Sequence, residues 1–209
     1  MMAVKELCQQ VPVIPVLVVH EREQAVPLAE TLVANGLPVL EVTLRTPAAL
    51  EVIRAMSEVP GAQVGAGTLL TPADVKAAKA AGACFGVSPG ATDCLLAAAR
   101  DEGLPLLPGV STASEIMYLL EQGVDAMKFF PAEAAGGVAM LKSWHGPLPQ
   151  AMFCPTGGIS ERTAASYLAL PNVMCVGGSW VTPDAMLKAG DWKGIGALAK
   201  ATHPLKATA

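Results

Sequence analysis

Lys128 is the residue whose setting most directly suggests chemistry. It lies in an apolar, strand-like run from Ala126 to Ala132. A lysine is seldom buried in such a run unless it is paired or has lost its charge. An uncharged amine attacks carbonyl carbons, so the run predicts a lysine that forms a Schiff base. Taken alone, the run would favour the alternative, a lysine at a strand end with its stem along apolar surface and its ammonium group in water.

A second polar group lies within another strand-like stretch. Glu41, Thr43 and Arg45 alternate with apolar residues between positions 39 and 45. Successive side chains of a strand point to opposite faces, so these three share one face. Three polar side chains on an interior face are costly unless they serve one another or a ligand. We therefore predict that this face lines a site; the alternative is a buried ion pair between Glu41 and Arg45.

Glycine pairs supply a third feature. Gly157-Gly158 and Gly177-Gly178 lie at the ends of two predicted strands, each pair next to a hydroxyl residue. Glycine lets backbone N–H groups approach an oxyanion, and barrel enzymes often hold phosphate in the loops after strands seven and eight. The pairs predict a phosphate cradle, which would work through backbone dipoles even in an acidic protein.

The order of the elements indicates how these groups are brought together. Short apolar runs alternate with longer stretches rich in Ala, Leu, Glu and Lys, which is typical of repeated βα units. Eight strands are predicted, at residues 11–19, 38–44, 63–69, 84–89, 105–110, 126–131, 151–156 and 173–177. The pattern predicts an α/β fold, a (β/α)8 TIM barrel forming one domain over residues 1–209. The alternative is a doubly wound open sheet, but no GxGxxG turn follows the first strand.

Helix boundaries are also visible. Start signals, mostly a threonine followed by proline, occur at Thr71-Pro72, Thr46-Pro47, Ser111-Thr112 and Thr182-Pro183. Three glycines are expected to end helices, namely Gly36, Gly103 and Gly123. In a barrel, the polar residues at the carboxyl ends of the strands would then meet at one face.

Composition excludes some classes of partner. The chain has 209 residues, 52% of them apolar, and a net charge of −4 without a Lys/Arg cluster, which argues against nucleic acid. The start carries Glu6 before a short apolar run broken by Pro12 and Pro15, unlike a signal peptide or a membrane span. We expect a cytoplasmic protein without a membrane partner.

Cysteine and histidine spacing suggests no metal centre. The five cysteines are widely spaced without a CxxC pair, and we expect reduced thiols in or near the core. The three histidines form no metal-ligand pattern. No metal and no cofactor are expected.

Several motifs together resemble one family in order and spacing. The chain resembles the bacterial 2-keto-3-deoxy-6-phosphogluconate (KDPG) aldolase and 4-hydroxy-2-oxoglutarate aldolase family. The motifs that carry the resemblance are Glu41–Thr46, Val64–Thr68, Ser88–Gly90, Lys128–Glu133, Pro155–Ile159 and Gly177–Trp180. The resemblance implies a class I aldolase, a lyase on a (β/α)8 barrel and usually a homotrimer. It would cleave KDPG to pyruvate and glyceraldehyde 3-phosphate in the Entner–Doudoroff pathway. Many relatives also cleave 4-hydroxy-2-oxoglutarate.

The resemblance also implies residue roles. Lys128 would form the Schiff base and Glu41 would be the general acid and base. The pyruvoyl carboxylate would be held by Arg45 and Thr68, between apolar walls at Pro89 and Phe130. The sugar hydroxyls and the phosphate would meet Thr156, Gly157, Gly158, Gly178 and Ser179. The hydroxyl of Thr156 favours the gluconate over the galactonate epimer.

Two other functions fit the same residues. Another phosphosugar aldolase, of the deoxyribose-phosphate or 6-phosphogalactonate type, would also use a lysine and a phosphate cradle. A non-catalytic barrel that senses a phosphorylated metabolite is the alternative of a different class, since a fold alone fixes no function. The sequence of such a sensor would lack the lysine or the carboxylate, and here both Lys128 and Glu41 are present.

Overall fold

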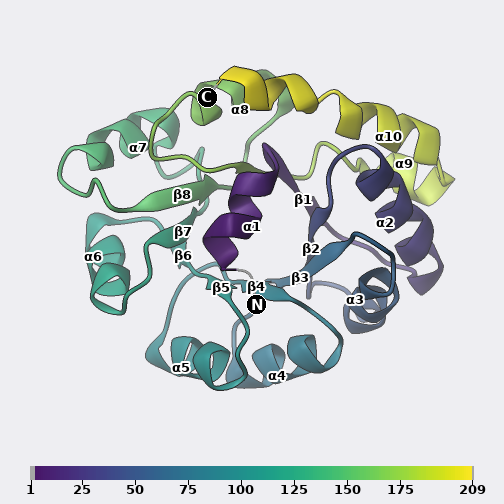
Figure 1. The fold of residues 1–209 in the computed structure, drawn as a ribbon, viewed down its shortest axis with the longest axis horizontal. Coiled ribbons are helices and arrows are strands. Elements are labelled where there is room, and N and C mark those ends of the chain that lie inside the picture. The colour runs from purple at the N-terminus through teal and green to yellow at the C-terminus, as the bar shows by residue number, and fades with distance from the viewer. Residues whose placement is uncertain (1–2, 209) are drawn as a thin grey trace.

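A ring of parallel strands with helices on its outside forms the protein (Figure 1). The computed structural model describes residues 3–208, with side chains described through residue 205. The strands are β1 (Val13–Leu17), β2 (Val39–Thr43), β3 (Gln63–Gly67), β4 (Phe85–Val87), β5 (Leu106–Leu107), β6 (Gly109–Val110), β7 (Ala126–Phe129), β8 (Met152–Pro155) and β9 (Val176–Gly178).

Strand pairing closes this ring. One run of paired strands has the order β5-β4-β3-β2-β1-β9 and another the order β6-β7-β8, all parallel. Single bridges from Phe153 to Val173 and from Thr156 to Gly177 join β8 to the β9 segment. The predicted (β/α)8 barrel is confirmed, and the open doubly wound sheet is wrong.

Proline divides the fifth predicted strand. The stretch 105–110 forms two short strands, β5 and β6, with Pro108 between them. Proline has no N–H to donate to a ladder, so regular pairing stops there. Its carbonyl oxygen still accepts a hydrogen bond from the Lys128 N–H at 2.8 Å. The eight predicted strands and the nine observed in residues 3–208 therefore describe the same ring.

Most of the helices follow the strands as expected. They are α1 (Val4–Gln10), α2 (Ala25–Ala34), α3 (Ala49–Ser57), α4 (Pro72–Ala80), α5 (Asp93–Asp101), α6 (Ala113–Glu121), α7 (Gly137–His145), α8 (Glu161–Leu168), α9 (Asp184–Ala189) and α10 (Trp192–Lys200), with 3-10 turns η1 (Arg22–Gln24) and η2 (His203–Thr208). None of the helices in the described part of the chain is long and apolar enough to cross a membrane.

Two of the predicted helix starts are confirmed and two are wrong. Thr71 and Thr112 cap α4 and α6, each side chain accepting a backbone N–H bond. Thr46 caps nothing, because its hydroxyl donates to the Val19 carbonyl at 2.7 Å and α3 begins three residues later. The cap of α9 is Pro183 rather than Thr182. The three glycines predicted to end helices do so with positive φ: Gly36, Gly103 and Gly123.

The helix α1 was not predicted, and it closes one end of the barrel (Figure 1). Lys5 donates to Asp125 at 2.6 Å, and Asp125 immediately precedes β7. The covered end is therefore the amino-terminal end of the strands. Leu7 and Cys8 of α1 are buried. Access to the interior is left to the opposite end, where the strands finish.

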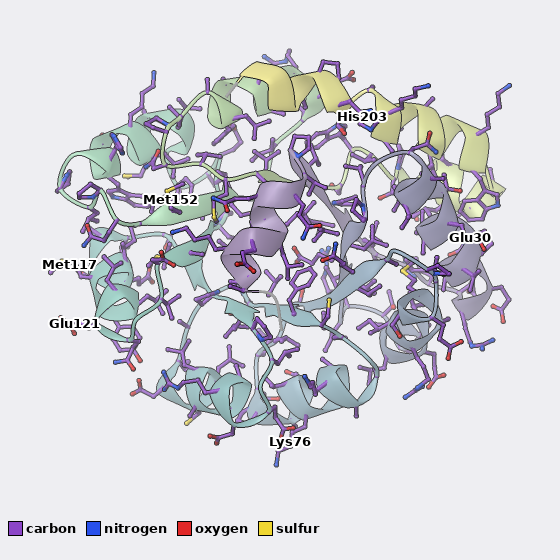
Figure 2. The ribbon with its side chains drawn as sticks, viewed as in Figure 1. Glu30, Lys76, Met117, Glu121, Met152 and His203 are labelled. Atoms are coloured by element: carbon purple, nitrogen blue, oxygen red, sulfur yellow. The ribbon has the colours of Figure 1, made fainter. Side chains whose placement is uncertain are left out.

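Apolar packing on the outer side of the strands holds the helices. Phe129 and Phe153 pack against Trp144 of α7, with ring centroids 5.0 and 5.6 Å apart. Figure 2 shows side chains filling the ring and the space under the helices, while Glu30 and Lys76 project outward. Because neighbours in a strand face opposite ways, an outward Phe129 places Lys128 inward.

Three of the five cysteines lie together inside the barrel. Cys8, Cys154 and Cys175 are buried, Cys84 is partly buried and Cys94 is exposed, all as free thiols. The prediction of core or near-core thiols is therefore wrong for Cys94. Hydrogen bonding to Cys154, followed by other contacts and burial, raises the pKa of the Cys175 thiol well above its ordinary value. Cys175 therefore stays protonated at neutral pH.

Gly109 in β6 permits one close backbone approach. A Cβ at Gly109 would lie 2.2 Å from the carbonyl oxygen of Pro89 and 2.8 Å from the N atom of Gly90. Both neighbours are backbone atoms, which cannot rotate away as a side chain can. A glycine at this position therefore lets the segment after β4 lie directly against β6.

We expect Gly109→Ala to destabilise the protein by about 1–3 kcal/mol, the usual cost of forcing a carbon into a packed site. Urea unfolding measures the change. The control is Gly146→Ala, because that glycine has an ordinary φ of −66° and no atom within 4 Å of a built Cβ. Equal midpoints for Gly109→Ala and the unchanged protein would contradict the steric argument.

Candidate active site

A cavity of 220 Å³ opens at the carboxyl end of the strands. Its lining comes from strands β1, β2 and β7 and from the segments after β2, β3, β4, β7 and β8: Val16, Glu41, Thr43, Arg45, Thr68, Pro89, Lys128, Phe130 and Thr156. Seven of these residues were predicted from the sequence as site residues. The fold thus brings together residues that lie more than a hundred positions apart in the chain.

The centre of the cavity is an ion pair. Lys128 donates from Nζ to Oε1 of Glu41 at 3.1 Å, and both residues are buried, with 6% and 3% exposed. The ring of Phe130 lies 5.3 Å from the same Nζ. The alternative of a lysine head in water is therefore wrong. So is the alternative of an ion pair between Glu41 and Arg45, because the Glu41 carboxylate is taken by Lys128.

Glycines next to these residues make room for side chains. A Cβ on Gly67 would lie 2.3 Å from Oε1 of Glu41, and one on Gly177 would lie 2.2 Å from Oγ1 of Thr156. Any other residue at these positions would push the carboxylate or the hydroxyl aside. Part of the glycine pattern is therefore explained by space for polar side chains and not by anion binding.

Arg45 is held at the cavity mouth by a short chain of hydrogen bonds. Its Nε donates to Oγ1 of Thr43 at 3.1 Å, and that hydroxyl donates to the Leu17 carbonyl at 2.9 Å. Thr43 is buried, whereas Arg45 is exposed. The sequence placed Thr43 on the face predicted to line a site but assigned it no role of its own.

Thr68 has an unusual backbone. Its φ is 64°, and it is the non-glycine residue with positive φ in the described part of the chain. A branched side chain rarely adopts this conformation, which costs about 1–3 kcal/mol. Such strain persists where the surroundings hold it, commonly at functional sites. Here it accompanies a side chain that lines the cavity.

Of the residues predicted for the phosphate end, Thr156 lines this cavity and the others lie outside its lining. Gly157 and Gly158 follow Thr156 with φ of 100° and 81°, a conformation that requires glycine. Ser179 lines an adjoining hollow of 410 Å³ that shares Val16 with the cavity. The linings of these two spaces do not include Gly157, Gly158 or Gly178. At Gly178 a Cβ would lie 1.8 Å from the ring of Trp180, so its glycine is explained by packing.

A larger hollow lies away from these residues. It measures 450 Å³ and lies between α5 and α6, with a mostly apolar lining to which Arg100 contributes a charge. No amine or carboxylate joins Arg100 in that lining. The smaller cavity, which combines an amine, a carboxylate and a guanidinium, is the better place for chemistry.

Comparison with known proteins identifies the family. The model of the family "Aldolase: KDPG and KHG aldolase" matches residues 4–198. This chain belongs to the KDPG and KHG aldolase family. It is 51% identical over 197 residues to a 2-dehydro-3-deoxy-phosphogluconate aldolase of Pseudoalteromonas atlantica, covering 94% of this chain and 92% of the relative. It is 53% identical over 190 residues to a KHG/KDPG aldolase of Escherichia coli, covering 90% and 89%.

Solved structures of the KDPG and KHG aldolase family share the fold. A KDPG aldolase from Legionella pneumophila, with pyruvate captured as a covalent carbinolamine intermediate, gives a TM-score of 0.93 at 47% identity. The two chains are covered to 96% and 98%. A KDPG aldolase from Zymomonas mobilis with 3-phosphoglycerate gives 0.91 at 49% identity, with 96% and 95% covered.

We expect Thr43→Val to weaken binding of pyruvate roughly tenfold or more, since a hydrogen bond from a charged group such as the Arg45 guanidinium contributes about 1.5–3 kcal/mol. The isosteric change removes the hydroxyl that orients Arg45. Calorimetric titration with pyruvate measures it. Thr43→Ser keeps the hydroxyl and is the matched control. If the serine variant loses as much affinity as the valine variant, the hydrogen bond is not what positions Arg45.

Proposed function

We propose that this protein is a class I aldolase that cleaves KDPG to pyruvate and D-glyceraldehyde 3-phosphate, and that it also accepts 4-hydroxy-2-oxoglutarate. The observation that carries the proposal is the contact of 3.1 Å between Lys128 and Glu41 inside the barrel. It pairs a nucleophile with a proton acceptor in one small cavity. Family membership supports the substrate class.

The first step is formation of the imine. Transfer of one proton from Lys128 to Glu41 gives the neutral amine needed for attack on C2 of the substrate. Glu41 then returns that proton to the carbinolamine hydroxyl, which leaves as water and gives an iminium, so that Glu41 is again a carboxylate. This cation accepts the electron pair released when the C3–C4 bond breaks, and the pair is held as an enamine.

Glu41 would carry out the proton transfers of the remaining steps. Its carboxylate takes the proton of the C4 hydroxyl, directly or through water, as the C3–C4 bond breaks and the aldehyde forms. The same group then returns a proton to C3 of the enamine. Water adds to the resulting iminium to give a second carbinolamine. Breakdown of this carbinolamine releases pyruvate and the amine of Lys128.

The other lining residues would orient the substrate. We assign the carboxylate of the substrate to Arg45 and Thr68, and the apolar walls beside the reacting carbons to Pro89 and Phe130. Arg45 suits a carboxylate because its guanidinium offers a fork of N–H donors. The distal hydroxyls and the phosphate are assigned to Thr156, Gly157, Gly158, Gly178 and Ser179. The Thr156 hydroxyl favours the gluconate epimer.

The setting of the enzyme is proposed from the family. We propose a single domain over residues 1–209 that assembles as a homotrimer, works in the cytoplasm in the Entner–Doudoroff pathway, and has neither nucleic acid nor membrane as a partner. Exposed apolar side chains at Leu70 and Met117 offer surface for subunit contacts.

Lys128→Met is expected to abolish pyruvate release, because no amine remains to form the imine. An assay coupled to lactate dehydrogenase measures the pyruvate. The variant leaves Glu41 buried without its cation, at a cost of about 3–5 kcal/mol, so we expect a folded but weakened barrel. The double variant Lys128→Met with Glu41→Gln should recover part of that loss.

The matched control for this experiment is Lys76→Met, which changes an exposed lysine on α4. It should leave pyruvate release unchanged. Substantial cleavage by Lys128→Met would remove Lys128 from the proposed role, and so would loss of cleavage in both variants.

Glu41→Gln is expected to lower kcat roughly a hundredfold to ten-thousandfold, the usual contribution of a positioned acid or base. Pyruvate should still form an imine, because Lys128 is intact, but more slowly, because the carboxylate that takes the Lys128 proton is gone. Single-turnover kinetics separates imine formation from cleavage. Unchanged kcat in Glu41→Gln would assign proton transfer to another group.

A further inference from the structure

A buried tyrosine contacts an acidic side chain next to the predicted phosphate cradle. Tyr167 of α8 is 1% exposed, and its hydroxyl donates to Oε1 of Glu133 at 2.5 Å. Glu133 lies in the segment between β7 and α7, while Tyr167 comes from the helix that follows β8. Neither residue lines the 220 Å³ cavity, and the proposed chemistry uses neither.

Glu133 lies directly against the two glycines that follow Thr156. Its N–H donates to the Gly157 carbonyl at 3.1 Å. A Cβ on Gly158 would lie 2.7 Å from both Cβ and Cγ of Glu133. The stem of this glutamate therefore packs on Gly158, while Glu133 as a whole is exposed.

A carboxylate beside the predicted phosphate cradle would disfavour binding of the substrate phosphate. A phosphate monoester carries nearly two negative charges at neutral pH, so an unrestrained carboxylate beside it would repel it. The Tyr167 hydroxyl supplies the restraint, since it donates to the carboxylate from the side of α8. Burial and the hydrogen bond to Glu133 raise the pKa of Tyr167 well above its ordinary value, so the hydroxyl remains a donor.

We propose that Tyr167 is a positioning residue that holds the Glu133 carboxylate away from the substrate phosphate and so preserves the preference for phosphorylated 2-keto acids. The inference rests on the proposed aldolase function and deepens it. Tyr167 touches no reacting atom. Tyr167 would act by fixing the position of the Glu133 charge next to the glycine pair. Its effect on substrate binding therefore depends on whether the substrate carries a phosphate.

The test compares two substrates that differ in the phosphate. We expect Tyr167→Phe to raise KM for KDPG about fivefold to tenfold, with kcat unchanged, as a freed charge near a dianion would do. The KM for 4-hydroxy-2-oxoglutarate, whose distal group is a singly charged carboxylate and not a phosphate, should rise by a clearly smaller factor. Adding Glu133→Gln to Tyr167→Phe removes the charge and should restore KM for KDPG.

A matched control is available within the chain, which has two tyrosines. Tyr118 of α6 also donates to a carboxylate, that of Asp93. Tyr118→Phe removes the same kind of hydrogen bond at the outer helices and should leave both KM values unchanged. Circular dichroism at the assay temperature checks that each variant is folded.

A second variant keeps the proposal testable if Tyr167→Phe does not fold. Glu133→Gln alone keeps the side-chain shape and removes the charge, and we expect it to lower KM for KDPG about twofold. A raised KM would overturn the proposal, because the carboxylate would then favour binding. Equal losses on both substrates in Tyr167→Phe, or no loss, would also overturn it.

Failure of the underlying function gives a different result. If the unchanged protein cleaves neither substrate, the proposed aldolase function itself fails, and the Tyr167 proposal falls with it. If the unchanged protein cleaves both substrates and the variants behave alike, only the Tyr167 proposal falls.

Discussion

The buried contact between Lys128 and Glu41 is the constraint on which the rest of the site depends. Moving either charge out of water costs several kcal/mol, and only a close partner offsets that cost. Each residue therefore makes burial of the other tolerable. The same closeness makes a proton easy to exchange, so one interaction serves both the stability of the folded site and the chemistry proposed for it.

The barrel provides the conditions for that contact. Parallel strands place Glu41 of β2 and Lys128 of β7 on opposite sides of one interior, α1 covers the amino-terminal end, and the carboxyl end stays open. Glycines complete the arrangement by leaving space, Gly67 for the Glu41 carboxylate and Gly177 for the Thr156 hydroxyl. The positive φ of Thr68 is a further example, because its backbone adopts an unfavourable conformation where its side chain lines the cavity.

The features that could be predicted from the sequence are those that depend on residues close together in the chain. Alternation along β2 placed Glu41 and Arg45 on the inner face, and the apolar flanks of Lys128 predicted its burial. Contacts between distant segments were not predictable in this way. The partner of the Thr46 hydroxyl is Val19, and the role of Thr43 depends on Leu17. The helix α1, which is only seven residues long, is held by its contacts with the barrel rather than by a strong local signal.

Borohydride reduction in the presence of pyruvate tests the central claim most directly. The protein would first be treated with EDTA, then trapped, digested and mapped by mass spectrometry. The account predicts a reduced pyruvate adduct on the peptide that contains Lys128, and its loss in Lys128→Met. An adduct on a different lysine, or none under conditions that trap a known class I aldolase, would contradict the account.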